Sequence, residues 1–250
     1  MKKALITGAS SGIGKEISLY LNSLGYSLIL VGRNPDKLNE VKKECKDSKV
    51  IICDLSEEKE VINLYEKTKD ENISLLVNNA AFGLFGYFDE TDLNAELKMI
   101  DLNIKGYHIL TKLFLKDFIL KDEGYILNVS SSAGFLSGPY LSTYYATKNY
   151  ITALTLAIYE ELKVKKSRVK ISLLAPGPVN TNFNKVAGGT FNVKGLTPEY
   201  VARVGIDNML KGKLIIVPTF KMKTGIFLIR LLPRKLLLKI TYRIQKRKNK

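Results

Sequence analysis

The sequence predicts an α/β fold: a single doubly wound Rossmann-type domain with a mostly parallel sheet of about seven strands and helices on both faces. Short apolar runs alternate with longer segments of helical periodicity through residues 1–218, as expected when strands are buried on both sides. A glycine-rich turn separates the first apolar run from the first helical segment. In such sheets ligands bind at the carboxyl ends of the strands.

The elements follow one another in a regular order. Strands are expected at residues 3–7, 27–32, 49–53, 74–78, 125–130, 169–175 and 214–217. Helices are expected from the glycine turn through Leu24 and at 35–46, 57–69, 93–120, 143–163 and 198–210. The start of the second helix is marked by Asn34, an N-cap residue, and by Pro35 at the first helical position.

Composition excludes several classes of protein. A chain of 250 residues with 46% hydrophobic content can bury one large core. Cys45 and Cys53 lack the spacing of a zinc site or a disulfide framework, and His108 is the only histidine, so no metal is expected. The apolar run near Met1 is too short for a signal peptide, and no stretch reaches the length of a membrane span. We expect a cytoplasmic protein.

The net charge of +15 is concentrated at the C-terminal end. No acidic residue follows Asp207, whereas thirteen of the 39 basic residues do, so the preceding part holds 26 basic and 24 acidic residues. The chain is therefore divided into a dinucleotide-binding and catalytic domain, 1–218, and a basic amphipathic tail, 219–250.

The tail has two open interpretations. Apolar residues Leu236, Leu237, Ile240 and Ile244 follow helical spacing among basic ones, after an apolar segment that Pro233 ends. Such a pattern over 225–250 is typical of a helix lying on an anionic membrane, here on its inner face. It equally fits a helix packed on the domain or on a partner subunit. Nucleic-acid binding is not favoured, because no aromatic stacking platform accompanies the charges.

Two motifs indicate chemistry. The turn that precedes the first helix suits phosphate binding, because glycines allow close backbone approach and the helix N-terminus offers free N–H groups; its residues are Gly8, Ser10, Ser11, Gly12, Ile13 and Gly14. Tyr144 and Lys148 stand four residues apart in a predicted helix, which brings a phenol and an ammonium together on one face.

Together these motifs resemble the short-chain dehydrogenase/reductase family. The resemblance covers about residues 3–218 and is carried by Gly8-x-x-x-Gly12-x-Gly14, Asn78-Asn79-Ala80, Asn103, Ser131, Tyr144-x-x-x-Lys148 and Pro176-Gly177. It implies hydride transfer between a nicotinamide cofactor and a carbonyl or alcohol. It also implies a homodimer or homotetramer.

The resemblance implies a role for each of four catalytic candidates. Tyr144 is expected to donate the proton, Lys148 to supply positive charge and hold the nicotinamide ribose, and Ser131 to bind the substrate oxygen. Asn103 is expected to link the lysine to solvent through water. The alternatives are the neighbours Tyr145, Ser130 and Ser132, and for Asn103 a purely structural role.

Cofactor choice depends on the end of the second strand. Gly32 stands where an NAD-binding protein commonly has an acid, and Arg33 follows it, which favours NADP(H). Further expected cofactor contacts are Asp54 and Leu55 at the adenine, and Asn79, Ala80, Pro176, Gly177, Val179 and Thr181 at the phosphates or nicotinamide. Ala81 replaces a glycine usual in the family, which would cost stability at a positive φ.

The sequence thus predicts an NADP(H)-dependent oxidoreductase that reduces an apolar ketone, aldehyde or lipid-like substrate, with a glycine-containing lid over residues 180–196. The alternative is a non-catalytic NADP-binding interaction or sensor protein that its basic tail targets.

Overall fold

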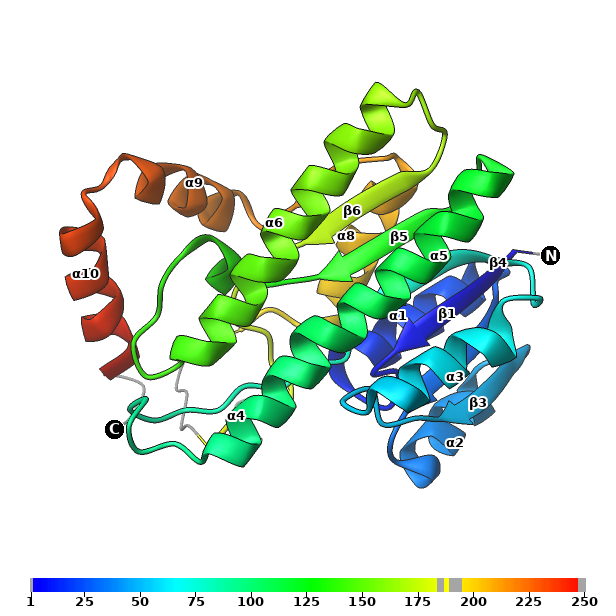
Figure 1. Cartoon of the computed structure of the whole chain (residues 1–250), viewed down its shortest axis with the longest axis horizontal. Helices are drawn as coiled ribbons and strands as arrows, with labels where there is room; N and C mark the ends of the chain where they lie inside the picture. Colours follow the sequence, from blue (N-terminus) through cyan, green and yellow to red (C-terminus); the bar gives the residue numbers. More distant parts are fainter. Residues whose placement is uncertain (1, 184–186, 189–194, 247–250) are drawn as a thin grey trace.

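The computed structural model describes residues 2–183, 187–188 and 195–246 (Figure 1). Seven parallel strands form one sheet in the order β3-β2-β1-β4-β5-β6-β7. The strands are β1 (Lys3–Thr7), β2 (Ser27–Gly32), β3 (Ser48–Ile52), β4 (Ile73–Asn78), β5 (Tyr125–Val129), β6 (Lys170–Leu174) and β7 (Ile215–Ile216). The order reverses between β1 and β4, and the predicted doubly wound α/β fold is confirmed.

Helices connect the strands and cover both faces of the sheet (Figure 1). They are α1 (Gly12–Ser23), α2 (Pro35–Glu44), α3 (Glu58–Thr68), α4 (Leu93–Ile100), α5 (Tyr107–Lys121), α6 (Ser142–Val164), α8 (Pro198–Leu210), α9 (Phe220–Leu228) and α10 (Arg234–Lys246). Short 3₁₀ turns lie at Ser132–Phe135 and Ile229–Leu231. The Asn34 side chain accepts a hydrogen bond from the Lys37 N–H, so the predicted cap of α2 is confirmed.

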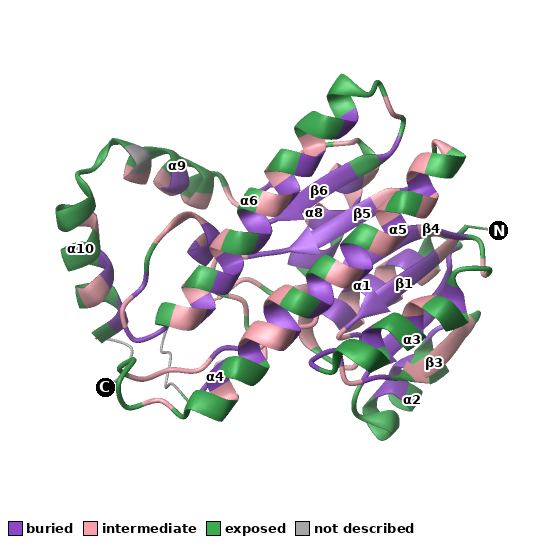
Figure 2. Cartoon of the chain, in the orientation of Figure 1, coloured by how far each residue is buried: buried purple, intermediate pink, exposed green. Residues whose placement is uncertain are grey.

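The core has two layers because successive residues of each strand point to opposite faces. Ile6 and Leu30 pack with α1, α2 and α8 on one face. Leu5 and Ile29 pack with α3, α5 and α6 on the other face. The central strands are buried on both faces, as the continuous apolar runs predicted (Figure 2).

One predicted helix is interrupted. The continuous helix predicted over 93–120 is instead α4, a π-helical stretch at Asp101–Gly106, and α5. A Cβ on Gly106 would lie 2.6 Å from the Leu55 carbonyl oxygen, so the chain approaches the loop after β3 closely at this point. π-helical turns are frequent at functional sites, and this one contains Asn103.

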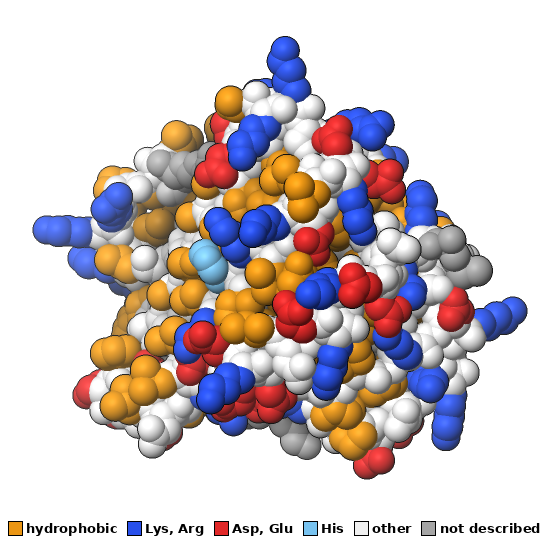
Figure 3. All heavy atoms as spheres, turned by 45° about the vertical axis from the view of Figure 1, so that its right-hand side comes forward, with side chains coloured by type: hydrophobic (Ala, Val, Ile, Leu, Met, Phe, Trp, Pro, Cys, Tyr) orange, Lys and Arg blue, Asp and Glu red, His pale blue; other side chains and the backbone are white. Residues whose placement is uncertain are grey.

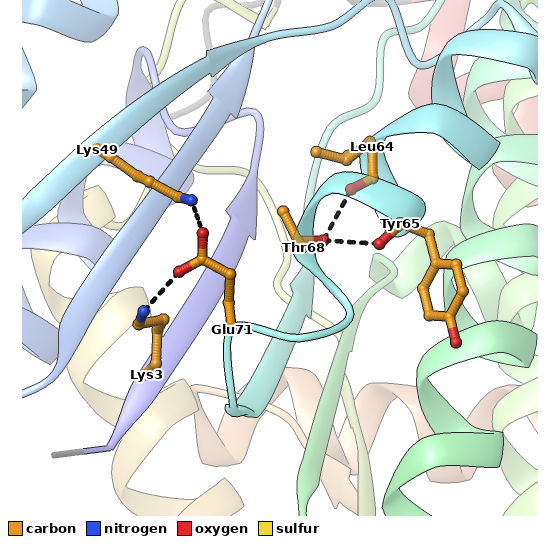
Figure 4. Close-up of polar contacts among 6 residues, drawn as sticks. All are labelled: Lys3, Lys49, Leu64, Tyr65, Thr68 and Glu71. Carbon is orange, nitrogen blue, oxygen red and sulfur yellow. Dashed lines mark hydrogen bonds and ion pairs between the residues drawn. The ribbon is translucent and has the colours of Figure 1, made fainter.

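The edge of the sheet opposite the carboxyl ends is held by Glu71 (Figure 4). Its carboxylate accepts hydrogen bonds from Lys3, at 2.6 Å, and from Lys49. Thr68 is the last residue of α3, and its hydroxyl donates to the Leu64 carbonyl at 2.7 Å. One carboxylate thus links β1 and β3 to the turn before β4, far from the carboxyl edge.

The C-terminal segment forms an arm of two helices, α9 and α10, with Pro233 between them. The helix after Pro233 and the break at this proline were predicted, whereas the helical form of α9 was not. In Figure 1 the arm lies beside the sheet, and α10 runs back towards the loops that precede α4 and α6. No helix in the described part of the chain is long and apolar enough to cross a bilayer.

Candidate active site

The glycine turn brings the start of α1 against the loop after β4. Gly8 has φ +65°, and a Cβ there would lie 2.9 Å from the Ala80 Cα. A Cβ on Gly14 would lie 2.2 Å from the Gly8 carbonyl oxygen. The N–H groups of Asn79 and Ala80 both donate to the Thr7 hydroxyl, at 2.8 and 3.1 Å. The turn therefore tolerates no side chain at either glycine.

A cavity of about 480 Å³ runs from this turn across the carboxyl ends of the strands. Most of the predicted cofactor residues line it: Gly8, Ser10, Ser11, Gly12, Ile13, Arg33, Leu55, Asn79, Ala80, Tyr144, Lys148, Pro176, Gly177, Val179 and Thr181. Gly14 and Asp54 stand behind this lining. The start of α1 has no side-chain cap, and the turn before it leaves no room for a side chain at Gly8 or Gly14. A phosphate of a dinucleotide could therefore approach the backbone N–H groups there.

Tyr144 and Lys148 lie on the first turns of α6, both buried, at 9% and 2% exposure. The Lys148 ammonium is 5.9 Å from the centre of the Tyr144 ring and donates to the Val129 carbonyl at 3.0 Å. Burial raises the pKa of Tyr144, so the phenol carries its proton at neutral pH. Burial lowers the pKa of Lys148 to about 7.

The three serines after β5 have different environments. Ser131 lines the cavity, and its hydrogen-bonding interaction with Tyr144 lowers the pKa of the phenol, in opposition to burial. The Ser130 hydroxyl is buried and donates to the Lys148 carbonyl at 3.1 Å, which gives it a structural contact. Ser132 lines the cavity too, and its N–H donates to the Pro176 carbonyl at 2.8 Å. Among the three, Ser131 meets Tyr144.

Asn103 does not line the cavity but braces its wall. Its side-chain oxygen accepts from the Phe82 N–H at 3.2 Å, and its amide donates to the Phe82 carbonyl at 2.8 Å. The same amide donates to the Thr147 hydroxyl at 3.1 Å. Asn103 therefore ties the loop after β4 to α6, which is the structural role kept as an alternative; its expected link from lysine to solvent stays a prediction.

Basic side chains gather at the end of the cavity beside the start of α2, where the family resemblance leads us to expect the adenosine of a dinucleotide. Arg33 is 58% exposed there, and its guanidinium lies 3.7 Å from the Asp54 carboxylate. Burial raises the pKa of Asp54, but hydrogen bonds from Ser56 and the charges of Arg33 and Lys98 outweigh it and lower the pKa. Lys37 also lines this end and was missed by the sequence analysis. Lys37 follows Arg33 by four residues and lies in the first turn of α2, and this spacing could have indicated that both side chains reach the same end of the cavity.

The other end of the cavity is largely apolar. Phe82, Leu141, Tyr145 and Phe183 line it. The described part of the predicted lid reaches this end through Phe183, which packs on Tyr144, whereas Thr181 lies against Gly12 of the glycine turn. The remainder of that lid, 184–186 and 189–194, lies outside the described residues. Ala81 is not among the described residues with positive φ, so the departure from the family glycine imposes no strain there.

The C-terminal arm contributes to the same cavity, which the sequence analysis did not predict. Gln245 of α10 lines the cavity and donates a hydrogen bond to the Tyr145 hydroxyl. Met222 of α9 lies against Gly177, where a Cβ would be 2.4 Å from its methyl carbon. No sequence pattern pointed to these contacts, because they join segments far apart in the chain.

In the described residues, no group of three or more histidine, cysteine or acidic side chains is placed to hold a metal ion. Cys45 and Cys53 are both buried and free. Burial raises the pKa of the Cys53 thiol to about 12, although this residue lines the cavity.

The model of the short chain dehydrogenase family matches residues 2–189. The chain belongs to this family. As a short-chain dehydrogenase it is an oxidoreductase, and its cavity lies where the residues carrying the family resemblance converge.

Relatives in the family span most of the chain. An uncharacterized oxidoreductase of Staphylococcus saprophyticus is 35% identical over 187 residues, covering 72% of this chain and 79% of the relative. The 3-oxoacyl-[acyl-carrier-protein] reductase FabG of Rickettsia prowazekii is 34% identical over 186 residues, covering 73% of this chain and 74% of that protein.

Solved structures of this fold carry either nicotinamide cofactor. A short-chain dehydrogenase from Sphingobium yanoikuyae in complex with NADPH has a TM-score of 0.82 at 23% identity, covering 88% of this chain and 89% of that one. One from Burkholderia phymatum in complex with NAD has a TM-score of 0.81 at 23% identity, covering 90% and 91%. At this identity the likeness is one of fold.

Proposed function

We propose that this protein is an NADP(H)-dependent reductase that converts an apolar ketone or aldehyde to the alcohol, with Tyr144 as the general acid. The observation that carries the proposal is that Tyr144, Ser131 and Lys148 line one cavity that continues to the glycine turn and Arg33. The similarity to the 3-oxoacyl-[acyl-carrier-protein] reductase of Rickettsia prowazekii supports a substrate that carries a carbonyl group on an apolar chain.

The bound cofactor would supply the hydride to the carbonyl carbon. Ser131 is positioned to donate a hydrogen bond to the carbonyl oxygen, which gains negative charge as the hydride arrives. Tyr144 then transfers its proton to that oxygen, and its raised pKa keeps the phenol protonated beforehand. Lys148, close to the ring, stabilises the phenolate to the extent that it is charged.

The adenosine end supports NADP(H) over NAD(H). Arg33 and Lys37 offer two positive charges where a 2′-phosphate would lie, and Gly32 brings no carboxylate to repel it. The Asp54 carboxylate nearby is already paired with Arg33 and Lys98. The apolar lining at the other end, from Phe82 to Phe183, favours a substrate without charge near its carbonyl.

Tyr144→Phe tests the proposal because it removes only the phenolic oxygen. NADPH oxidation with a panel of hydrophobic ketones and aldehydes should fall by at least about a hundredfold, the usual contribution of a general acid. NADPH affinity, measured by fluorescence titration, should change little. The matched control is Tyr150→Phe on the same helix, whose hydroxyl contacts His108 at the surface.

An unchanged rate in Tyr144→Phe would rule out this tyrosine as the acid. If the unmodified protein binds NADPH but shows no NADPH oxidation with any compound of the panel, the non-catalytic NADP-binding alternative is favoured instead.

A further inference from the structure

The arm formed by α9 and α10 has one side against the body and one side uncovered. Thr241 and Gln245 of α10 are 6% and 2% exposed and face the body. Tyr242 stacks on Tyr140 of the loop before α6, with ring centres 5.5 Å apart. Figure 2 shows buried residues on only one side of α10 and exposed residues over the rest of it. The body therefore fixes how the helix is rotated.

This rotation leaves an apolar stripe in solvent. Leu236, Ile240 and Ile244 recur every four residues on one side of α10 and are 47%, 37% and 49% exposed. Before Pro233, Phe227 of α9 and Leu231 of the 3₁₀ turn are also exposed, at 62% and 69%. A contiguous set of large exposed apolar side chains marks a contact surface.

A basic stripe runs beside the apolar one. Lys235, Lys239 and Arg243 also recur every four residues, one position before the apolar residues, and all three are exposed. No acidic residue occurs anywhere after Asp207. The surface thus combines apolar side chains with cationic ones and carries no compensating negative charge of its own.

We propose that this surface of α9 and α10 docks on an anionic phospholipid bilayer, with the apolar stripe in the interfacial region and the basic stripe at the headgroups. A second copy of the chain is a poorer occupant, because a twofold contact would bring two all-basic surfaces together. Nucleic acid is a poorer occupant because it would leave the apolar stripe in water.

Docking would place the substrate end of the cavity next to the lipid. Gln245, on the inner side of the same helix, lines the cavity, and its side-chain oxygen is buried without a partner among the described residues. The helix that would meet the bilayer also contributes Gln245 to the wall of the cavity. This step rests on the proposed function: an apolar substrate dissolved in the membrane would lie on the other side of that helix.

The test is sedimentation of the full chain with phosphatidylcholine vesicles, with and without about 30% phosphatidylglycerol. We expect binding to the anionic vesicles only, and weaker binding as the salt concentration rises. Lys235→Glu/Lys239→Glu/Arg243→Glu should lower the partition coefficient by at least about a hundredfold, since each of the three basic residues near the surface contributes about fivefold. Leu236→Ser/Ile240→Ser/Ile244→Ser should lower it by at least about tenfold.

Two matched controls keep charge and exposure comparable. Lys42→Glu/Lys43→Glu/Lys46→Glu makes the same charge change at exposed lysines near α2. Leu24→Ser/Ile62→Ser/Leu120→Ser removes exposed apolar residues from the body. Both controls should bind anionic vesicles nearly as well as the parent chain, after a small correction for net charge.

Three outcomes would overturn the proposal: the parent chain stays in the supernatant, the controls lose binding as strongly as the arm variants, or the chain binds RNA and not vesicles. A fourth is a change of oligomeric state in the apolar-stripe variant, seen by light scattering, without any vesicle binding by the parent. That result would assign the surface to contact between copies of the chain.

Discussion

At the scale of single residues, environment separates neighbours that the sequence could not. Tyr144 and Tyr145 both stand within helical reach of Lys148, but the Tyr145 hydroxyl is engaged by Gln245 of the arm, whereas Tyr144 meets Ser131. A one-residue step along a helix turns a side chain by about 100°. Both tyrosines line the cavity, and the choice of Tyr144, which the family spacing favours, stays a prediction.

Cofactor preference is a prediction at this scale. Arg33→Ala/Lys37→Ala removes both positive charges from the adenosine end of the cavity. NADPH affinity should fall by at least about a hundredfold, because two charge–phosphate contacts are lost and each contributes about 1.5–3 kcal/mol net of hydration. NADH affinity should change by less than about threefold, since NADH carries no 2′-phosphate.

Fluorescence titration with NADPH and with NADH measures the two affinities and hence the preference for one cofactor over the other. Lys42→Ala is the control, because Lys42 is an exposed lysine of α2 outside the cavity lining. Equal losses for NADPH and NADH in the double variant would contradict a role for these residues in recognising the 2′-phosphate.

At the scale of elements, the sequence predicted the body better than the arm. Apolar runs and helical periodicity located each of the seven strands and the helices between them to within a few residues, because buried parallel strands and amphipathic helices leave strong local patterns. The break at Asp101–Gly106 was missed because single π-helical turns are rare and leave no strong local pattern, and because the close approach of Gly106 to Leu55 there is a tertiary contact. Packing of the C-terminal helix on the domain was one of the two alternatives left open, and α10 does contact the body, but its particular partners could not be predicted because the contacts are tertiary.

An aromatic cluster holds α10 against the body of the protein. Tyr140 has φ +67°, unusual for a bulky residue, and stacks between Phe85 and Tyr242, while its hydroxyl lies 2.8 Å from that of Tyr87. The cluster joins the loop after β4, the loop before α6 and the arm. An aromatic pair of this kind contributes about 0.5–1.5 kcal/mol beyond the burial of its area.

Tyr242→Ala should therefore release α10 without unfolding the body. We expect faster hydrogen exchange in residues 234–246 and faster tryptic cleavage at its basic residues, with the exchange of β1, β4 and β5 unchanged. Ile244→Ala, a truncation on the uncovered side of the same helix, is the control and should leave both rates nearly unchanged. Equal protection in the two variants would show that the cluster does not hold the arm.

At the scale of the whole molecule, surface character differs between the body and the arm. The face in Figure 3 shows apolar patches among basic and acidic side chains of the body. Beyond Asp207 all charge is positive. This asymmetry could be seen from composition alone. The structure adds which side of α10 is exposed to solvent and which side, with Gln245, lines the cavity.

Global stability should carry a signature of the buried lysine. Burial lowers the pKa of Lys148 to about 7 from its ordinary value of 10.5, so between these values the unfolded chain binds a proton that the folded chain has released. Stability rises with pH wherever the unfolded state binds more protons. In the absence of cofactor, Lys148 therefore makes a contribution that destabilises the fold most below pH 7 and fades as pH approaches 10.5.

Lys148→Met tests this linkage because it keeps the apolar stem and removes the titrating group. The free energy of unfolding, from urea titrations of the variant minus that of the parent chain, should fall as pH rises from 7 towards 10, by up to about 1.4 kcal/mol per pH unit. Taking the difference cancels the titration of the other tyrosines and lysines. A difference independent of pH would mean that Lys148 keeps its charge in the folded protein, and hence that it is paired within the cavity more strongly than its single hydrogen bond to Val129 implies.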